Sequence, residues 1–230
     1  HPTILRRQRQ MCIRDRLCVI AEELGRFLAP VPFSSSVYLF TEAIINYAND
    51  DIKKEILPKL VSGEVIGTLA VAEDLQAPTA ENITLQSDNN ILNGKKIAVP
   101  DAEIATHAIV VAKTSSGISL QLVDLNADGV KIEKQENIDE SRGYFSILFE
   151  NSPSKLIGDE TGGWDLYEAL MNQAAVLFGY EQIGGSQAAL DMAINYSKER
   201  YAFGRQIGSF QAIKHKPVSY THLRAHETQY

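Results

Sequence analysis

Three side chains in the stretch 200–211 could together bind a phosphate-bearing ligand. Arg200 carries a planar guanidinium whose fork of donors matches phosphate oxygens. Phe203 adds an apolar aromatic face, and Gln211 adds an amide that can form hydrogen bonds with a polar edge of the ligand. The alternative for Arg200 is a charge that complements the negative end of a helix. Both interpretations need the elements around the stretch.

A helix is predicted directly before this stretch. Apolar residues recur there at spacings of three, four or seven, as on one face of a helix: Val176, Tyr180, Ile183, Leu190 and Ile194. We expect Gly204 to end this helix in the left-handed conformation, with Lys198, Arg200 and Arg205 near its negative end. Gly179, Gly184 and Gly185 are unfavourable within a helix, which predicts tight packing against another backbone.

The order of residues in the stretch resembles the signature of the acyl-CoA dehydrogenases. The matching positions are Arg200-x-x-Phe203-Gly204, then Ile207, then Phe210-Gln211. The resemblance implies that Arg200 and Gln211 contact the FAD bound by a neighbouring subunit and that Phe203 packs beside it.

Composition and charge exclude several other classes of protein. The 230 residues are 44% hydrophobic and 22% charged, with a formal net charge of -7. Such a chain can form one large domain or two to three small ones, and its acidity argues against nucleic-acid binding. No apolar run approaches a membrane span. The sequence has only two cysteines, which argues against a disulfide framework and favours a cytoplasmic location. His107 and His215 have no second histidine or cysteine at the spacing of metal ligands, which argues against a metal site.

The two ends of the sequence are related in an unusual way. Met11-Cys12-Ile13-Arg14-Asp15 can be encoded by a DNA string whose reverse complement encodes Val-Ser-Tyr-Thr-His, the sequence at 218–222. We interpret residues 1–16 and 217–230 as foreign, adapter-derived sequence and exclude them from fold prediction. The alternative is coincidence. If the ends are foreign, the natural protein continues in both directions and this chain is a fragment.

Residues 17–66 are predicted to be helical. The first helix has one apolar face and ends at Pro30 and Pro32; the face comprises Leu17, Ile20, Ala21, Leu24, Phe27 and Leu28. A second helix is expected over 36–47. A third begins near Asp50 and Asp51, whose charges suit a helix start, and carries Ile52, Ile56 and Leu60. The segment 57–64 resembles the family's leucine-proline followed by a serine-glycine-glutamate turn, which leads into its middle β domain.

Residues 67–155 change to short runs of β-forming residues, which predict a β barrel or sandwich. The predicted strands cover 69–72, 83–86, 91–99, 108–113, 118–125, 130–135 and 145–149. Hairpin turns are expected at 88–90 and 115–117, because asparagine and glycine tolerate positive φ. Asn93-Gly94-Lys95-Lys96 resembles the family's asparagine-glycine-x-lysine turn.

Residues 156–216 resemble the start of the family's C-terminal helical domain. The resemblance therefore implies an α+β fold over 17–216: a helical N-terminal part, a β middle domain and a helical C-terminal part truncated here. It also implies a glutamate base that removes the substrate's α proton while FAD takes the β hydride. That glutamate is expected beyond Lys216. An alternative position for it corresponds to Ala174, and an arginine that helps to hold CoA corresponds to Ala175.

The segment that corresponds to the family's flavin loop departs from the usual pattern. Val71 and Ala72 match cofactor-binding positions, but Ala72 replaces a threonine and so lacks its hydroxyl, although Glu73 is kept. Pro100 replaces another threonine and has neither a hydroxyl nor a backbone N–H. Two hydrogen-bond donors to the flavin are therefore expected to be missing.

Two functions remain open at this point. The first is an FAD-dependent acyl-CoA dehydrogenase that converts an acyl-CoA to the trans-2-enoyl-CoA and passes electrons to electron-transfer flavoprotein. The second is a catalytically degenerate subunit that shares FAD in a heteromer with a related subunit, as in family members that act on bulky steroid thioesters. The resemblance implies a homo-oligomer in the first case. An oxidase that passes electrons to oxygen is a third possibility.

Overall fold

The computed structural model describes residues 2–139 and 141–227, with side chains for 14–139 and 141–220. Residues 1 and 228–230, at the two ends that are predicted to be foreign, lie outside the described residues. The chain forms two compact units: residues 30–176, and residues 1–29 together with 177–230. No described helix has the length and apolar character needed to cross a membrane.

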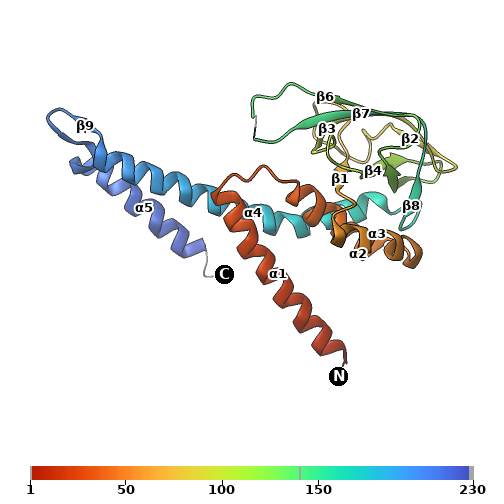
Figure 1. Ribbon diagram of the computed structural model, residues 1–230, viewed down its shortest axis with the longest axis horizontal. Helices are drawn as coiled ribbons and strands as arrows, with labels where there is room; N and C mark the ends of the chain where they lie inside the picture. Colours follow the sequence, from red (N-terminus) through yellow and green to blue (C-terminus); the bar gives the residue numbers. More distant parts are fainter. Residues whose placement is uncertain (1, 140, 228–230) are drawn as a thin grey trace. The chain divides into compact units, whose positions relative to one another are not determined.

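The unit formed by residues 30–176 is built on one mixed sheet of eight strands (Figure 1). Its strands are β1 (Gly67–Ala70), β2 (Gln86–Asp88), β3 (Ile91–Pro100), β4 (His107–Lys113), β5 (Ile118–Asp124), β6 (Val130–Lys134), β7 (Tyr144–Pro153) and β8 (Lys155–Ile157). Their order is β6-β7-β3-β2-β4-β5-β8, and β1 pairs in parallel with β4. Most neighbours are antiparallel, as expected for strands joined by short turns.

The sheet confirms the predicted run of strands. Each predicted segment corresponds to a strand, although β2 begins at Gln86 where the prediction ended, and β8 was not predicted. Asn89 and Asn90 form the β2–β3 hairpin turn with φ of 47° and 62°, and Gly117 lies in the β4–β5 turn with φ of 156°. These are the positions where asparagine and glycine were expected to supply positive φ.

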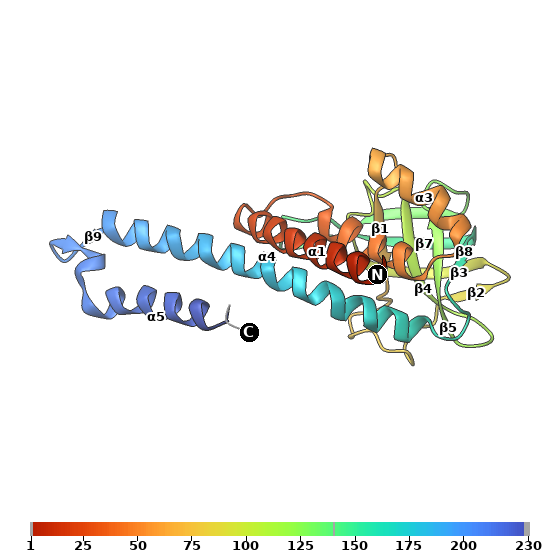
Figure 2. The same ribbon diagram turned by 90° about the horizontal axis from the view of Figure 1, so that it is seen from below.

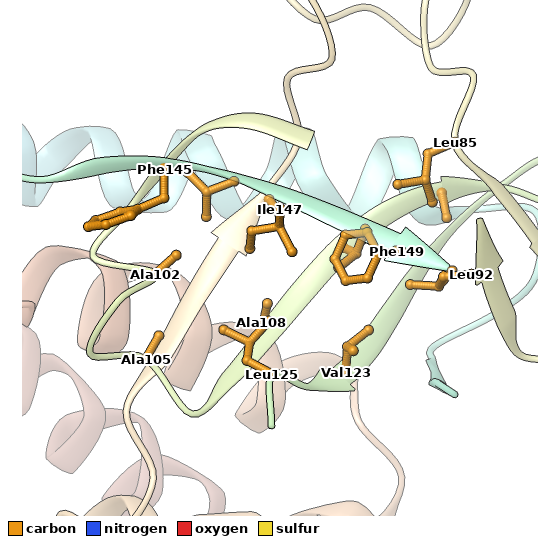
Figure 3. Close-up of a cluster of buried hydrophobic side chains, with 14 residues drawn as sticks. Leu85, Leu92, Ala102, Ala105, Ala108, Val123, Leu125, Phe145, Ile147 and Phe149 are labelled. Atoms are coloured by element: carbon orange, nitrogen blue, oxygen red, sulfur yellow. The ribbon is translucent and has the colours of Figure 1, made fainter. Parts of the chain in front are cut away.

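A buried apolar cluster of this unit is made of side chains from the strands and from the loops that join them. Figure 3 shows Phe145, Ile147 and Phe149 of β7 projecting toward Ala108 and Val123. The cluster also contains Ala70, Leu85, Leu92, Val99, Ala102, Ala105, Val110, Ala112 and Leu125. Burial of this apolar surface is the main stabilising contribution to the unit.

The helices of this unit are η1 (Ser34–Thr41), α2 (Glu42–Tyr47) and α3 (Asp50–Ser62). The predicted helix over 36–47 is present, but its first half is a π-helix, in which the Thr41 hydroxyl donates to the Ser36 carbonyl at 2.7 Å. Phe40 of η1 packs against β1 so closely that a Cβ on Gly67 would lie 1.9 Å from its ring. Gly67 therefore allows β1 to contact the π-helix.

Helix α3 begins as predicted at Asp50, but the residue that caps it is Asn49, whose side chain accepts from the Ile52 amide at 2.9 Å. Figure 2 shows α3 beside the sheet. Lys155 of β8 donates to Glu55 of α3 at 2.8 Å. The helix is thus held at one edge of the sheet.

The other unit begins with α1 (Pro2–Arg26), and here one prediction is wrong. Phe27 and Leu28 were assigned to the helix, but they follow its end and are 76% and 71% exposed. Leu28 has φ of 44°, its amide donates to the Gly25 carbonyl, and the Ala29 amide donates to the Leu24 carbonyl. This pair of hydrogen bonds is a Schellman motif, which ends the helix before the prolines.

The rest of this unit comprises the second half of α4 (Gly163–Glu199), β9 (Tyr201–Ala202), β10 (Arg205–Gln206), η2 (Ile207–Ser209) and α5 (Gln211–Glu227). The predicted apolar face of α4 is only partly correct, because Val176 and Tyr180 are exposed. Farther toward its N-terminus the helix buries Leu170 and Ala174 instead.

The predicted tight packing is confirmed for Gly184, where α1 crosses α4. It is wrong for Gly179, where nothing lies within 4 Å of a built Cβ, and a Cβ on Gly185 would make only an ordinary contact, 3.4 Å from the Gly25 carbonyl oxygen. A Cβ built on Gly184 would lie 1.8 Å from the Glu22 carbonyl oxygen, and one on Gly25 would lie 1.9 Å from the Glu181 carbonyl oxygen. The two glycines thus let the helix backbones touch, and Arg26 of α1 donates to Asp191 of α4 at 3.5 Å beside the crossing.

Candidate functional site

A β-hairpin with a two-residue loop follows α4 and carries the first group of predicted site residues. Strands β9 and β10 pair with Ala202 opposite Arg205, so Phe203 and Gly204 form the loop. Both have positive φ, 54° and 76°, which is the pattern of a type I′ turn. The prediction that Gly204 ends the helix is therefore wrong: α4 ends at Glu199, and Gly204 uses its left-handed conformation to turn the hairpin.

Phe203 is held in an unfavourable conformation on the outside of the molecule. A bulky residue with positive φ is uncommon, and its side chain is 96% exposed. Its ring meets Phe210 edge to face at 6.3 Å, and the Arg205 guanidinium lies 4.0 Å from the centre of the Phe210 ring. Phe210 thus supports two side chains of the hairpin. An exposed, strained aromatic is typical of a residue kept for binding.

Arg200 and Gln211 lie at the two ends of the same short segment. The Arg200 amide donates to the Tyr196 carbonyl at 2.9 Å, and its carbonyl accepts from the Ile207 amide at 2.8 Å, so its backbone is fixed on both sides. Gln211 is the first residue of α5. Both side chains are exposed, and within the described residues neither makes a hydrogen bond or ion pair. They are available to a ligand or to another subunit.

The second group of predicted site residues, Val71 and Ala72, belongs to the unit formed by residues 30–176. They follow β1 and are held by two consecutive residues of β3. The Val71 carbonyl accepts from Lys96 Nζ at 2.8 Å, and the Ala72 carbonyl accepts from the Ile97 amide at 2.8 Å. Both carbonyls of this pair are therefore already used within the fold.

Glu73, the next residue, forms a largely buried ion pair with Lys96. Lys96 Nζ lies 2.7 Å from Glu73 Oε1, and the exposed fractions of the two side chains are 0% and 11%. Glu73 also accepts from the Thr84 hydroxyl, from the Thr84 amide at 2.8 Å and from the Leu85 amide at 3.0 Å. The Glu73 carboxylate therefore links the two ends of the loop formed by residues 74–83.

Burial acts on the pKa values of both members of this pair. Burial lowers the pKa of Lys96 to about 8, against the opposing effect of the Glu73 carboxylate. Burial raises the pKa of Glu73, but the hydrogen bonds from Lys96, Thr84 and Leu85 outweigh it, so its pKa lies below the ordinary value. Both groups are charged at neutral pH.

Strand β3 bulges directly after this contact. Its pairing with β7 shifts between Lys96 and Val99, and Ala98 has φ of 51°. The Ala98 amide donates to Gln135 Oε1 at 2.8 Å, while Pro100 accepts at its carbonyl from the Thr68 hydroxyl at 2.6 Å. Pro100 supplies no donor at this end of the strand.

Two histidines, His107 and His215, lie among the residues whose side chains the structure describes. His107 is half-buried, with Nδ1 3.0 Å from the Thr106 hydroxyl, and burial lowers its pKa. His215 is exposed. Over residues 14–139 and 141–220 no group of three histidine, cysteine, aspartate or glutamate side chains is arranged to hold a metal ion.

Sequence reasoning missed three contributions to these sites. Lys96 was noted as part of a turn, but it lies in a strand on the same face as Leu92, four residues earlier, and that spacing could have indicated an inward lysine. Glu73 was noted as a kept residue of the flavin loop, but its pairing with Lys96 and the stacking of Arg205 on Phe210 had no signal in the sequence pattern.

Comparisons with known proteins agree with this architecture. The family model for the acyl-CoA dehydrogenase N-terminal domain matches residues 15–64, and the model for the acyl-CoA dehydrogenase C-terminal domain matches residues 161–224. A solved structure of the steroid ACAD Tcur3481-Tcur3483 superposes with a TM-score of 0.78 at 28% identity, covering 92% of this chain and 58% of that chain. The predicted α+β fold with a middle β domain is confirmed.

Curated relatives show the same kinship. The acyl-CoA dehydrogenase of Bacillus subtilis (strain 168) is 28% identical over 213 residues, 84% of this chain and 55% of that protein. The mitochondrial isovaleryl-CoA dehydrogenase of Pongo abelii is 31% identical over 227 residues, 90% of this chain and 53% of that protein. The chain belongs to the acyl-CoA dehydrogenase family, and it spans about half the length of the curated relatives it matches.

Proposed function

We propose that the protein carrying this chain is a subunit of an FAD-dependent acyl-CoA dehydrogenase, which oxidises an acyl-CoA thioester to the trans-2-enoyl-CoA. The observation that carries the proposal is the hairpin segment after α4. It holds Arg200, Phe203 and Gln211 at its surface, with the two polar side chains unengaged among the described residues.

The chemistry of these side chains fits FAD. Arg200 supplies a charged fork for the phosphates, Phe203 an apolar face, and Gln211 an amide for a polar edge. We propose that this group reaches FAD held mainly by a neighbouring subunit, and that the Val71–Ala72 segment contacts a flavin in this subunit's own site. When bound, FAD supplies a hydride acceptor at the substrate's β carbon.

The catalytic base is proposed to come from a glutamate beyond Lys216. The alternative position on α4 is Ala174, which is 1% exposed and has no carboxylate. Ala175, which follows it, offers no guanidinium to CoA. Residues of this chain would thus bind the cofactor and shape the site, whereas the proton would leave to a group outside 17–216.

A second candidate is a degenerate subunit that shares FAD within a heteromer. It is favoured by Ala72 and Pro100, which supply neither of the two hydroxyls expected beside the flavin, and by Ala175. The steroid ACAD with the same fold carries a name of two components, Tcur3481-Tcur3483. By analogy, a related second subunit would complete the site.

We also propose where the protein is located and which protein accepts its electrons. Few cysteines favour the cytoplasm, and electron-transfer flavoprotein is the proposed acceptor.

Turnover by the full-length protein tests the proposal. The protein, alone and with any co-encoded relative, would be mixed with acyl-CoA substrates and an artificial electron acceptor. Reduction by the lone protein supports the active enzyme, and reduction only with the relative supports the degenerate subunit. Peroxide formation would indicate an oxidase. No oxidation of any acyl-CoA in either preparation would contradict both candidates.

A further inference from the structure

We propose that Lys96 and Glu73 are positioning residues for the flavin site, because they fix the backbone of residues 71–73 against strand β3. We call this pair and its contacts the Lys96–Glu73 clamp. The inference rests on the proposed function, since Val71 and Ala72 are the residues proposed to contact the flavin.

The clamp holds three consecutive residues through two consecutive residues of β3. Lys96 Nζ donates to the Val71 carbonyl at 2.8 Å and to Glu73 Oε1 at 2.7 Å, and the Ile97 amide donates to the Ala72 carbonyl at 2.8 Å. A side chain thus fixes the two outer residues and the backbone fixes the middle one. Ala72 has little freedom to shift along or away from β3.

The carboxylate extends the clamp to the far end of the loop. Glu73 accepts from the backbone amides of Thr84 and Leu85 at 2.8 and 3.0 Å, and Leu85 belongs to the apolar core at 2% exposure. The segment between Glu73 and Thr84 is therefore tied at both ends to residues with little freedom of movement. A loop anchored in this way presents its first residues in one geometry.

The burial of Lys96 argues that the clamp has more than a packing role. A fully buried ammonium loses its hydration, and an ion pair often stabilises a fold no better than apolar residues of the same size. A methionine would fill a similar volume without that penalty. What methionine cannot do is donate to Val71 and Glu73 at once, so the lysine contributes a defined loop position.

The experiment measures FAD dissociation constants and thermal unfolding midpoints in the full-length protein, together with its relative if one is needed for FAD binding. The variants are Lys96→Met, the double variant Lys96→Met with Glu73→Gln, and Lys95→Met. Lys95 is the adjacent, exposed lysine, so its variant makes the same chemical change outside the clamp.

We expect Lys95→Met to bind FAD as the parent protein does, and Lys96→Met to bind at least tenfold more weakly and to unfold at a lower temperature. The double variant leaves no unpaired buried charge, so its unfolding midpoint should recover while its FAD affinity stays low. Recovery of both together would show a purely structural pair and overturn the inference, as would normal affinity in Lys96→Met. A parent protein that binds no FAD in any combination overturns the proposed function itself, and the clamp's role at the flavin with it.

Discussion

The crossing of α1 and α4 allows a matched pair of glycine substitutions. Gly184→Ala would place a methyl group 1.8 Å from the Glu22 carbonyl oxygen and 2.9 Å from the Arg26 amide nitrogen. Both contacts are backbone atoms, which cannot rotate away, so the helices must separate. Gly179→Ala makes the same change in the same helix, but nothing lies within 4 Å of its new Cβ.

The two variants share one energetic contribution and differ in the other. Alanine is favoured over glycine in a helix by about 1 kcal/mol, so Gly179→Ala should raise the free energy of unfolding by about that amount. Overpacking against fixed atoms costs about 1–3 kcal/mol, and contacts this short favour the upper end. Gly184→Ala should therefore lower the free energy of unfolding by about 2 kcal/mol net, which puts the two variants about 3 kcal/mol apart.

Urea unfolding followed by far-ultraviolet circular dichroism measures the difference directly, with the slope of each transition as a check that the unfolded states are alike. A Gly184→Ala protein as stable as Gly179→Ala would contradict this expectation, because the helices would then tolerate a methyl group where the structure leaves no room.

Three further results are expected. Arg200→Ala should weaken FAD retention by about 1.5–3 kcal/mol, the contribution of a charged hydrogen bond, and unchanged flavin content in the purified full-length protein would contradict the assignment. Phe203→Asn should relieve the positive φ in the type I′ turn and raise the free energy of unfolding by about 1 kcal/mol while lowering flavin content; a fall in both would show that Phe203 stabilises the fold instead. The buried Lys96 has a pKa of about 8 in the folded chain, against an ordinary 10.5. Between pH 8 and 10.5 the unfolded chain therefore binds more protons than the folded chain, and the free energy of unfolding rises with pH over this range. Relative to Lys96→Met, the parent protein should gain up to about 3 kcal/mol from pH 8 to 10.5 in denaturant titrations, and parallel curves would contradict the sign.

Strands and their turns were predictable because their signals are local. Asn89 and Asn90 tolerate the positive φ that a tight hairpin needs, and the apolar runs on each side are the core of the sheet. Asp50 and Asp51 indicated the start of α3 for a similar reason, since acidic side chains suit a helix N-terminus.

Other features depend on contacts that a local pattern does not contain. A glycine with positive φ serves a helix end or a hairpin loop equally well, so Gly204 could not be assigned without the pairing of Ala202 with Arg205. The end of α1 at Leu28 uses a Schellman motif without glycine. Lys96 needs a partner 23 residues away in sequence, and that partner decides whether a strand lysine is buried or exposed.

The proposed cofactor role of Arg200, Phe203 and Gln211 is most directly tested by the visible absorption spectrum of the full-length protein. It would be purified alone and together with any co-encoded relative. We expect a flavin band in at least one preparation. The lone protein should show it if the segment around Ala72 and Pro100 still holds FAD, and only the mixture with the relative should show it if Arg200 and Gln211 serve a site built mostly by another subunit. A colourless protein in both preparations, with no band after incubation with FAD, would contradict the proposed cofactor role of these three residues.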